Sequence, residues 1–181
     1  MRIEDSRIFI VSRPDDARFL RATAKPAVFE ANGSVRFGDE LLSKKQVDEL
    51  IHHMKHIMRE ANGVGLSANQ IGLPYRLFVA SVHTTQGEPR SYAILNPVIE
   101  KSGSGTAMLE EGCLSIPDVY GDVPRARQVV LKGFDKRGAP VKIKAWDLLA
   151  RVFQHEIDHL DGKVFTDRTK VIRRMEPPPT L

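Results

Sequence analysis

The 181-residue sequence contains a single cysteine, Cys113, so no disulfide can form within the chain. A lone thiol is typical of a protein in a reducing compartment. No apolar run approaches the roughly 18 residues at which a membrane-spanning helix is expected. Near the N-terminus, Glu4, Asp5 and Arg7 stand where a signal peptide needs its apolar segment. We therefore expect a cytoplasmic protein that does not act in a membrane.

Neither sign of charge predominates in the chain. The 27 basic residues are nearly balanced by 23 acidic residues, and no run of five or more basic residues occurs. Proteins that read nucleic acid usually cluster Lys and Arg on one face or in a run. We therefore expect no specific binding of nucleic acid.

The chain has no visible internal repeat, and its length corresponds to one domain. We expect a single domain over residues 1–181. The stretch Pro177-Pro178-Pro179 cannot be helical, because proline lacks the backbone N–H. Residues 168–181 are therefore expected to form a frayed tail.

One long helix is predicted over residues 43–61. Ser43 and Gln46 form a capping-box pair at its start, and Asn62-Gly63 ends it. Apolar side chains recur at helical spacing between them. His52, His53 and His56 lie on the opposite, polar face, and we expect solvent there rather than a metal.

The rest of the chain reads as strands followed by a terminal helix. Residues 1–42 are punctuated by Pro, Gly and Asn, which favours short strands and turns. Asp147 can cap a second helix that runs to about Leu160. The pattern predicts an α+β fold of antiparallel strands packed around this C-terminal helix. The predicted strands are 77–82, 92–100, 128–134 and 141–145, the last two joined by a hairpin turn at 135–138.

The terminal helix carries the motif H-E-x-x-H, in which His155 and His159 lie four residues apart on one helix face. Two imidazoles in this arrangement can bind one metal ion. Glu156, next to the first histidine, is placed to act as a general base on a metal-bound water. Leu148 and Val152 precede the histidines on the same face, which favours an apolar pocket beside the metal.

A catalytic metal needs a third protein ligand, and no histidine follows His159. The remaining soft donor is Cys113, in the segment EGCLS. A lone cysteine is more often a small buried apolar residue, so this thiol alone does not establish ligation. A third segment, GVGLSANQ, has glycines that allow close backbone approach and an amide donor in Gln70.

Taken together, the three segments resemble the peptide deformylase family, which carries G-x-G-L-A-A-x-Q, E-G-C-L-S and Q-H-E-x-D-H-L in this order. The last two match fully as EGCLS and QHEIDHL, and the first departs once, with Ser67 for the usual alanine. The stretch from Arg13-Pro14 to Pro26 also resembles the family's opening. The similarity covers most of the chain through Asp167.

The resemblance implies removal of the formyl group from the N-terminal formyl-methionine of new polypeptides, so that the predicted domain is catalytic. Cys113, His155 and His159 would bind one divalent metal. The metal lowers the pKa of its water, Glu156 takes the proton, and the hydroxide attacks the formyl carbon. The Gln70 amide and the Leu114 N–H would stabilise the oxyanion.

The resemblance also implies how the peptide is held. Val64, Gly65 and Gly112 would bind its backbone by main-chain hydrogen bonds. The methionine pocket would be lined by Val64, Leu148, Val152 and His155. Arg125 matches a family position near the peptide channel, and a solvated surface arginine is the alternative reading. Asp158 turns away from the ligand face, which favours an ion-pair partner over a ligand.

Metal and partners follow from the same resemblance. The ligand set suits Zn²⁺, whereas the family works best with Fe²⁺ and often carries zinc after purification. We therefore expect Fe²⁺ in the cell and Zn²⁺ in purified protein. The partners are N-formyl-Met peptides and nascent chains, with transient ribosome contact. Many members extend in a long terminal helix, whereas this chain stops soon after Arg174, so ribosome docking through such a helix does not follow from the resemblance.

Two other functions stay open at this point. The first is a zinc endopeptidase that uses HEIDH with a different third ligand. The second is a non-catalytic metal protein that binds peptides. Replacing Cys113 tests the first, because such a peptidase would keep its metal. Replacing Glu156 tests the second, because a structural metal site needs no base.

Overall fold

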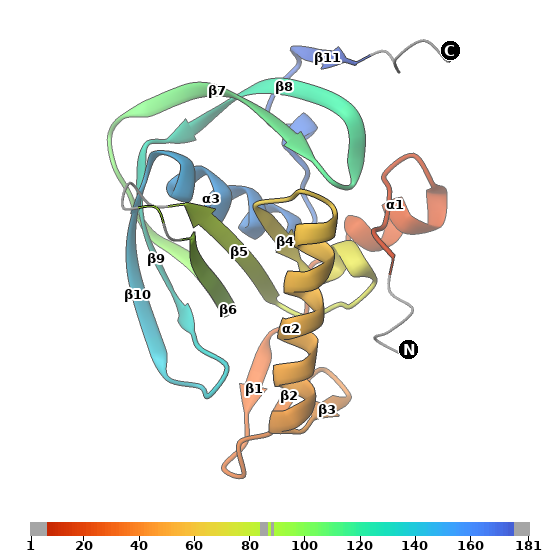
Figure 1. The fold of residues 1–181 in the computed structure, drawn as a ribbon, viewed down its shortest axis with the longest axis vertical. Helices are drawn as coiled ribbons and strands as arrows, with labels where there is room; N and C mark the ends of the chain where they lie inside the picture. Colours follow the sequence, from red (N-terminus) through yellow and green to blue (C-terminus); the bar gives the residue numbers. More distant parts are fainter. Residues whose placement is uncertain (1–6, 84–86, 88, 176–181) are drawn as a thin grey trace.

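The chain folds as three antiparallel sheets, and a C-terminal helix, α3 (Asp147–Leu160), packs against two of them (Figure 1). The structure is a computed structural model and describes residues 7–83, 87 and 89–175. The predicted α+β class, with antiparallel strands around the helix that carries HExxH, is confirmed. The largest sheet has the order β10-β9-β6-β5-β4, formed by β4 (Gly65–Ser67), β5 (Leu77–His83), β6 (Pro89–Ser102), β9 (Gln128–Phe134) and β10 (Pro140–Trp146).

Strand β5 is buried on both faces, which explains its nearly continuous apolar sequence. Successive side chains of a strand point to opposite faces. Leu77 and Val79 belong to one hydrophobic cluster, with the buried face of helix α2 (Lys44–Glu60). Phe78 and Ala80 belong to a second cluster, with the apolar side chains of α3. The central sheet therefore joins the two long helices into one framework.

Helix α2 forms as predicted. Ser43 is its N-cap, and the capping box with Gln46 is present in both directions. Its apolar stripe is buried, including Leu50 and Met54 at 0% exposure. His52 and His56 are exposed on the opposite face, as the spacing predicts.

Two small sheets flank the central one. The first has the order β1-β2-β3, with β1 (Ala27–Phe29), β2 (Val35–Phe37) and β3 (Glu40–Leu42). The second has the order β11-β8-β7, with β7 (Thr106–Cys113), β8 (Ile116–Ala126) and β11 (Ile172–Arg174). Two short 3-10 helices, η2 (Ala68–Ile71) and η3 (Phe165–Asp167), follow β4 and α3.

The N-terminal region contains a helix that the sequence reading missed. The expectation of short strands and turns over residues 1–42 is correct for β1–β3 but wrong for α1 (Pro14–Leu20). Pro14 is accepted in the first turn because its missing N–H has no partner there, and Asp15 and Asp16 favour the same end of a helix. Residues 1–6 lie outside the described residues.

The β7–β8 hairpin was also missed. It has no clean alternation of apolar and polar residues, since Met108 and Leu109 are consecutive and both exposed. The predicted frayed tail is wrong for residues 172–174, which form β11 and pair with Val119–Gly121 of β8. Residues 176–181 of that prediction lie outside the described residues.

The end of β10 leads directly into α3. The helix starts at Asp147, so Trp146 rather than Asp147 occupies the N-cap position, without a side-chain capping bond. The predicted hairpin turn before β10 is present: Asp135 Oδ1 accepts from the N–H groups of Arg137 and Ala139. Within the described residues, no helix is both long and apolar enough to cross a bilayer.

Helix α2 gives a direct test of this core. Met54→Ala should lower the free energy of unfolding by about 2–5 kcal/mol, because it leaves a cavity under the helix. His52→Ala, on the exposed face two residues earlier, should change it by less than about 0.5 kcal/mol. Urea denaturation of the two variants measures both values. Equal losses would show that the stripe does not form the core contact described.

Candidate active site

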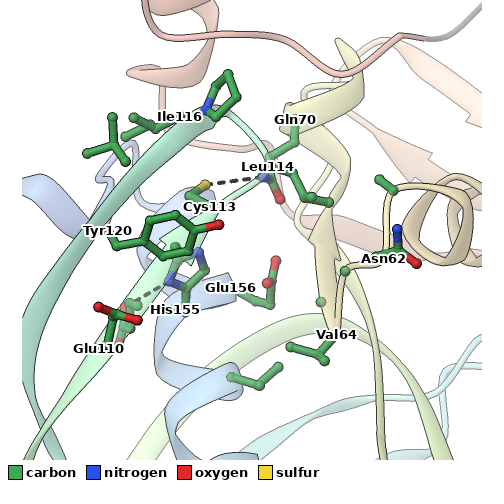
Figure 2. Close-up of a pocket in the computed structure, with 18 of the residues that line it drawn as sticks. Asn62, Val64, Gln70, Glu110, Cys113, Leu114, Ile116, Tyr120, His155 and Glu156 are labelled. Atoms are coloured by element: carbon green, nitrogen blue, oxygen red, sulfur yellow. Dashed lines mark hydrogen bonds and ion pairs between the residues drawn. The ribbon is translucent and has the colours of Figure 1, made fainter. Parts of the chain in front are cut away.

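A cavity of about 520 Å³ lies where helix α3, strand β4 and the β7–β8 hairpin meet. Figure 2 shows His155 and Glu156 pointing into it, with Tyr120 on one side and Val64 on the other. Most of the candidate site residues predicted from the three sequence segments line this cavity. They are Val64, Gly65, Gln70, Gly112, Cys113, Leu114, Leu148, Val152, His155 and Glu156.

Three side chains that could hold a metal ion converge beside the cavity. The ligand atoms of Cys113, His155 and His159 all lie within 4.8 Å of one another. Nε2 of His159 is 3.2 Å from Nε2 of His155 and 3.2 Å from Sγ of Cys113. The histidines come from successive turns of α3, whereas Cys113 comes from the end of β7. The fold therefore supplies the third donor that the helix lacks.

Two of the three donor separations are close to those of a four-coordinate metal ion. Metal bonds of about 2.0–2.1 Å to nitrogen and 2.3 Å to sulfur place the two nitrogens about 3.3 Å apart, and nitrogen and sulfur about 3.6 Å apart. The observed separations of 3.2 Å are close to both values. Three protein donors would leave one position of a four-coordinate ion for another ligand, which is the pattern of a catalytic site rather than a structural one.

The ionisation of Cys113 also suits a metal ligand, because the thiolate is the form that binds metals. Burial would raise the pKa of this thiol, but the positive charges of His159 and His155 and their hydrogen bonds lower it to about 5. The sulfur thus carries its charge in a site that two imidazoles hold together.

Glu156 lies beside the three ligands and is 3% exposed. Burial raises the pKa of its carboxyl group above the usual range for glutamate. Its Oε2 accepts a hydrogen bond of 2.7 Å from Oγ of Ser67 in β4. The carboxyl group is therefore held close to the metal ligands and away from bulk water.

Gln70 reaches the same place from the first turn of η2. Its Oε1 accepts from the N–H of Ser67 at 2.8 Å, so its NH₂ group points the other way. That NH₂ group donates to Ser115 Oγ at 3.1 Å and lies 3.7 Å from Cys113 Sγ. Leu114 lies in the turn between β7 and β8, beside Gln70 in Figure 2. Both residues border the cavity next to the cysteine.

A buried carboxylate, Glu111, contacts the helix that carries both histidines, and the sequence analysis did not identify it. Its Oε2 is 2.9 Å from Nδ1 of His155, which leaves Nε2 of that histidine free for the metal. A signal was available, because Glu111 and Cys113 are two apart in a strand and such residues point to one face.

Arg151 ties Glu111 to the hairpin and was also missed. Its Nη1 donates to Glu111 Oε1 at 2.6 Å and to the carbonyl of Val123 at 2.9 Å. Its Nη2 donates to the carbonyl of Ala107 at 2.7 Å. Since Arg151 stands four residues before His155, it lies on the ligand face of α3. The hairpin that carries Cys113 is therefore bonded to the helix that carries both histidines.

Arg125 lies at neither of the two positions considered from the sequence, the peptide channel and the solvated surface. Arg125 does not border the cavity, and at 4% exposure it is not a solvated surface residue either. Its guanidinium group donates twice to Glu111 at 2.9 Å and also pairs with Asp158. Unpaired charge is costly to bury, so these carboxylates determine where the arginine lies. Asp158 is an ion-pair partner, as its helical position predicts, and pairs with Arg168 too.

The Glu111 network predicts a large difference between two adjacent glutamates. Glu111→Gln should lower the free energy of unfolding by about 3–5 kcal/mol, because it leaves the buried guanidinium groups of Arg125 and Arg151 short of negative charge. Glu110→Gln, whose side chain is 53% exposed and pairs with Arg173, should cost less than about 1 kcal/mol. Urea denaturation of both variants gives the comparison.

The pH dependence of unfolding is the control for this prediction. Burial would raise the pKa of Glu111, but hydrogen bonds from His155 and Arg125 lower it from 4.5 to about 2. A carboxyl group with a lowered pKa stabilises the fold above its unfolded pKa and loses that contribution as pH falls through its folded pKa. Between about pH 4.5 and 2, wild-type stability should therefore fall more steeply than that of Glu111→Gln. Parallel curves would contradict the network.

Comparison with known proteins gives one consistent family. The family described as polypeptide deformylase matches residues 21–175. A peptide deformylase from Pelotomaculum thermopropionicum is 41% identical over 152 residues, which cover 79% of this chain and 94% of that protein. A peptide deformylase from Hydrogenovibrio crunogenus is 39% identical over 168 residues, 93% of this chain and 89% of that one.

The fold gives the same result. The crystal structure of a peptide deformylase from Synechococcus elongatus in complex with actinonin matches with a TM-score of 0.75 at 31% identity. The match covers 92% of this chain and 79% of that one. The family match includes β4, the β7–β8 hairpin and α3, which together form the cavity. The chain therefore belongs to the polypeptide deformylase family.

Proposed function

We propose that the chain hydrolyses the formyl group from the N-terminal formyl-methionine of newly made polypeptides, in a metal-dependent reaction. The observation that carries the proposal is the convergence of Cys113, His155 and His159 with Glu156 in one cavity. Membership of the deformylase family supports it. The actinonin complex of the Synechococcus elongatus relative supports ligand binding in this fold.

Cys113, His155 and His159 would hold the metal. A bound divalent ion supplies a Lewis acid, which polarises a carbonyl oxygen and lowers the pKa of water. Glu111 keeps His155 in the orientation and tautomer that present Nε2 to the ion. Arg151 keeps Glu111 and the hairpin together. The protein residues thus fix the shape of the site before substrate arrives.

Glu156 is the general base and then the general acid. It takes a proton from the water that attacks the formyl carbon, and a C–O bond forms. It then gives a proton to the amine nitrogen as the C–N bond of the formyl group breaks. The products are formate and a free N-terminal amine. Burial, which raises the pKa of this carboxyl group, favours a group that both accepts and returns a proton.

Gln70 and Leu114 stabilise the negative charge that develops on the formyl oxygen. Gln70 has its amide oxygen occupied by the N–H of Ser67, which fixes its NH₂ group toward the cysteine side of the cavity. The backbone N–H of Leu114 is the second donor, from the turn beside Cys113. Donors fixed in advance cost no reorganisation during the reaction, which makes them effective for such charge.

Two strand edges and an apolar pocket bind the peptide. Gly65 of β4 and Gly112 of β7, with Val64, offer main-chain groups to an extended chain, as in strand addition. The methionine side chain enters beside Val64, Leu148, Val152 and His155. Val64 is 47% exposed and Leu148 is 52% exposed, so the pocket is open to an arriving side chain. A peptide would cover this apolar surface.

The metal and the place of action complete the proposal. We propose Fe²⁺ in the cell and Zn²⁺ in purified protein, since both fit one sulfur and two nitrogen ligands. We place the activity in the cytoplasm, where a metal-binding thiolate stays reduced. The second partner is the ribosome, contacted transiently because new N-termini emerge there.

The ligand set is tested by replacing the cysteine. Cys113→Ala should lose most of its bound metal, because two imidazoles alone leave the ion with too few protein ligands. Metal content after dialysis, measured by elemental analysis beside wild type and the surface variant Glu60→Gln, gives the answer. Full retention of metal by Cys113→Ala would favour the zinc endopeptidase with a different third ligand.

The reaction is tested by formate release from a formyl-Met tripeptide, with protein loaded with Fe²⁺ without oxygen. Glu156→Gln keeps the shape of the side chain but cannot take a proton, so the rate should fall by about 10²–10⁴-fold at unchanged metal content. Glu60→Gln, on the exposed face of α2, should match wild type.

The products separate the alternatives. Formate together with an intact tripeptide indicates deformylation, whereas shorter peptides in the mass spectrum indicate an endopeptidase. A folded, metal-loaded protein that releases neither would favour the non-catalytic peptide-binding function. Equal rates for Glu156→Gln and wild type would remove Glu156 from the mechanism.

A further inference from the structure

Strand β4 holds the carboxyl group of Glu156 from one side, through a residue that the proposed reaction does not use. We propose that Ser67 is a positioning residue, which fixes the carboxylate of Glu156 and the amide of Gln70 in their working orientations. The inference rests on the proposed function, since it assigns the residue that orients the general base. In the deformylase motif G-x-G-L-A-A-x-Q, alanine is usual at the position of Ser67.

The hydroxyl of Ser67 is aimed at Glu156. Its Oγ lies 2.7 Å from Oε2 of the carboxyl group and 3.0 Å from the backbone oxygen of Glu156. A hydroxyl has one proton to donate, and a carboxylate is the stronger acceptor of the two. Ser67 is 0% exposed, so water does not compete for this bond. Within the described part of the chain, it is the only hydrogen bond to that carboxyl group.

Gly65 lies against the other oxygen of the same carboxyl group. Gly65 and Ser67 are two apart in β4 and therefore present the same face of the strand. A Cβ on Gly65 would lie only 2.2 Å from Oε1 of Glu156, so that oxygen occupies the space of the missing side chain. One carboxyl oxygen is thus fixed by contact and the other by a hydrogen bond.

The main chain of Ser67 acts on the second reacting group. Its N–H donates to Oε1 of Gln70 at 2.8 Å, which turns the NH₂ group of Gln70 toward Ser115 and Cys113. The side chain of Ser67 therefore orients the general base Glu156, and its backbone N–H orients the oxyanion donor Gln70. A shift of β4 would move both groups together.

A hydroxyl suits a group that changes between base and acid. It donates to Glu156 when that group is a carboxylate and accepts from it when that group is a carboxylic acid. Ser67 keeps its own proton throughout, since it can donate to the backbone oxygen of Glu156 while it accepts. Alanine offers neither bond, so only the contact with Gly65 would then orient the carboxyl group.

The first test is kinetic. Ser67→Ala should lower kcat for formyl-Met tripeptide about tenfold, as expected for the loss of a hydrogen bond to a charged group, while KM stays within about twofold. Ser67→Thr keeps the hydroxyl, suits a strand, and should recover most of kcat. Ser81→Ala removes a hydroxyl from the neighbouring strand β5 and should match wild type. A kcat for Ser67→Ala within twofold of wild type overturns the proposal.

The second test asks whether Ser67 acts through Glu156. Adding Ser67→Ala to Glu156→Gln should cause little further loss, because the base that Ser67 positions is already absent. A tenfold loss in both backgrounds would show that the serine acts on something else and would overturn the proposal.

The third test does not depend on activity. Crystal structures of the zinc-loaded wild type and Ser67→Ala should show one orientation of Glu156 in wild type and a second one in the variant. Metal content should be equal in both. An unchanged Glu156 in the variant overturns the proposal. If wild type releases no formate, the proposed function fails, while these structures still decide whether Ser67 holds Glu156.

Discussion

The site depends on the charge of one buried carboxylate, Glu111. It contacts the candidate metal ligand His155 and the guanidinium groups of Arg125 and Arg151, so it joins helix α3 to the hairpin that carries Cys113. Glu111 compensates the charge of both buried arginines, and Asp158 also pairs with Arg125. Two elements far apart in the sequence thereby become one rigid support. A metal site formed from a helix and a hairpin needs such a support, because small displacements of ligands weaken binding.

Much of the site could be predicted from sequence because its parts are short and local. Two histidines four residues apart on a helix, with a glutamate between them, lie on one helix face, so their arrangement follows from the sequence alone. Helix α2 was predictable for the same reason, since its cap and its stripe are local signals. Cys113 is different: it lies 46 residues from His159, and only the resemblance linked the two before the fold did.

The residues that sequence reasoning missed or misplaced are those whose roles arise from tertiary contacts. Arg125 reads as a surface or channel residue until Glu111 and Asp158 are seen around it. Strand β11 reads as a polar tail until its pairing with β8 is known. Ser67 reads as a small change in a motif, yet in space it touches Glu156. The role of a charged or hydroxyl group depends on its ion-pair and hydrogen-bond partners in space, which no local sequence pattern identifies.

The order of the strands limits which polypeptides can enter the cavity. Among the described strands, β4 is an edge of the central sheet and β7 is an edge of the sheet that ends in β11. Both edges border the cavity, which Gly65 and Gly112 help to line, and an edge strand carries unpaired backbone groups. A folded protein has already satisfied its own backbone hydrogen bonds and cannot thread a terminus between two strand edges. In the proposed function, the cavity would thus discriminate by chain state: it would admit an extended, still unstructured end and exclude one that has already folded.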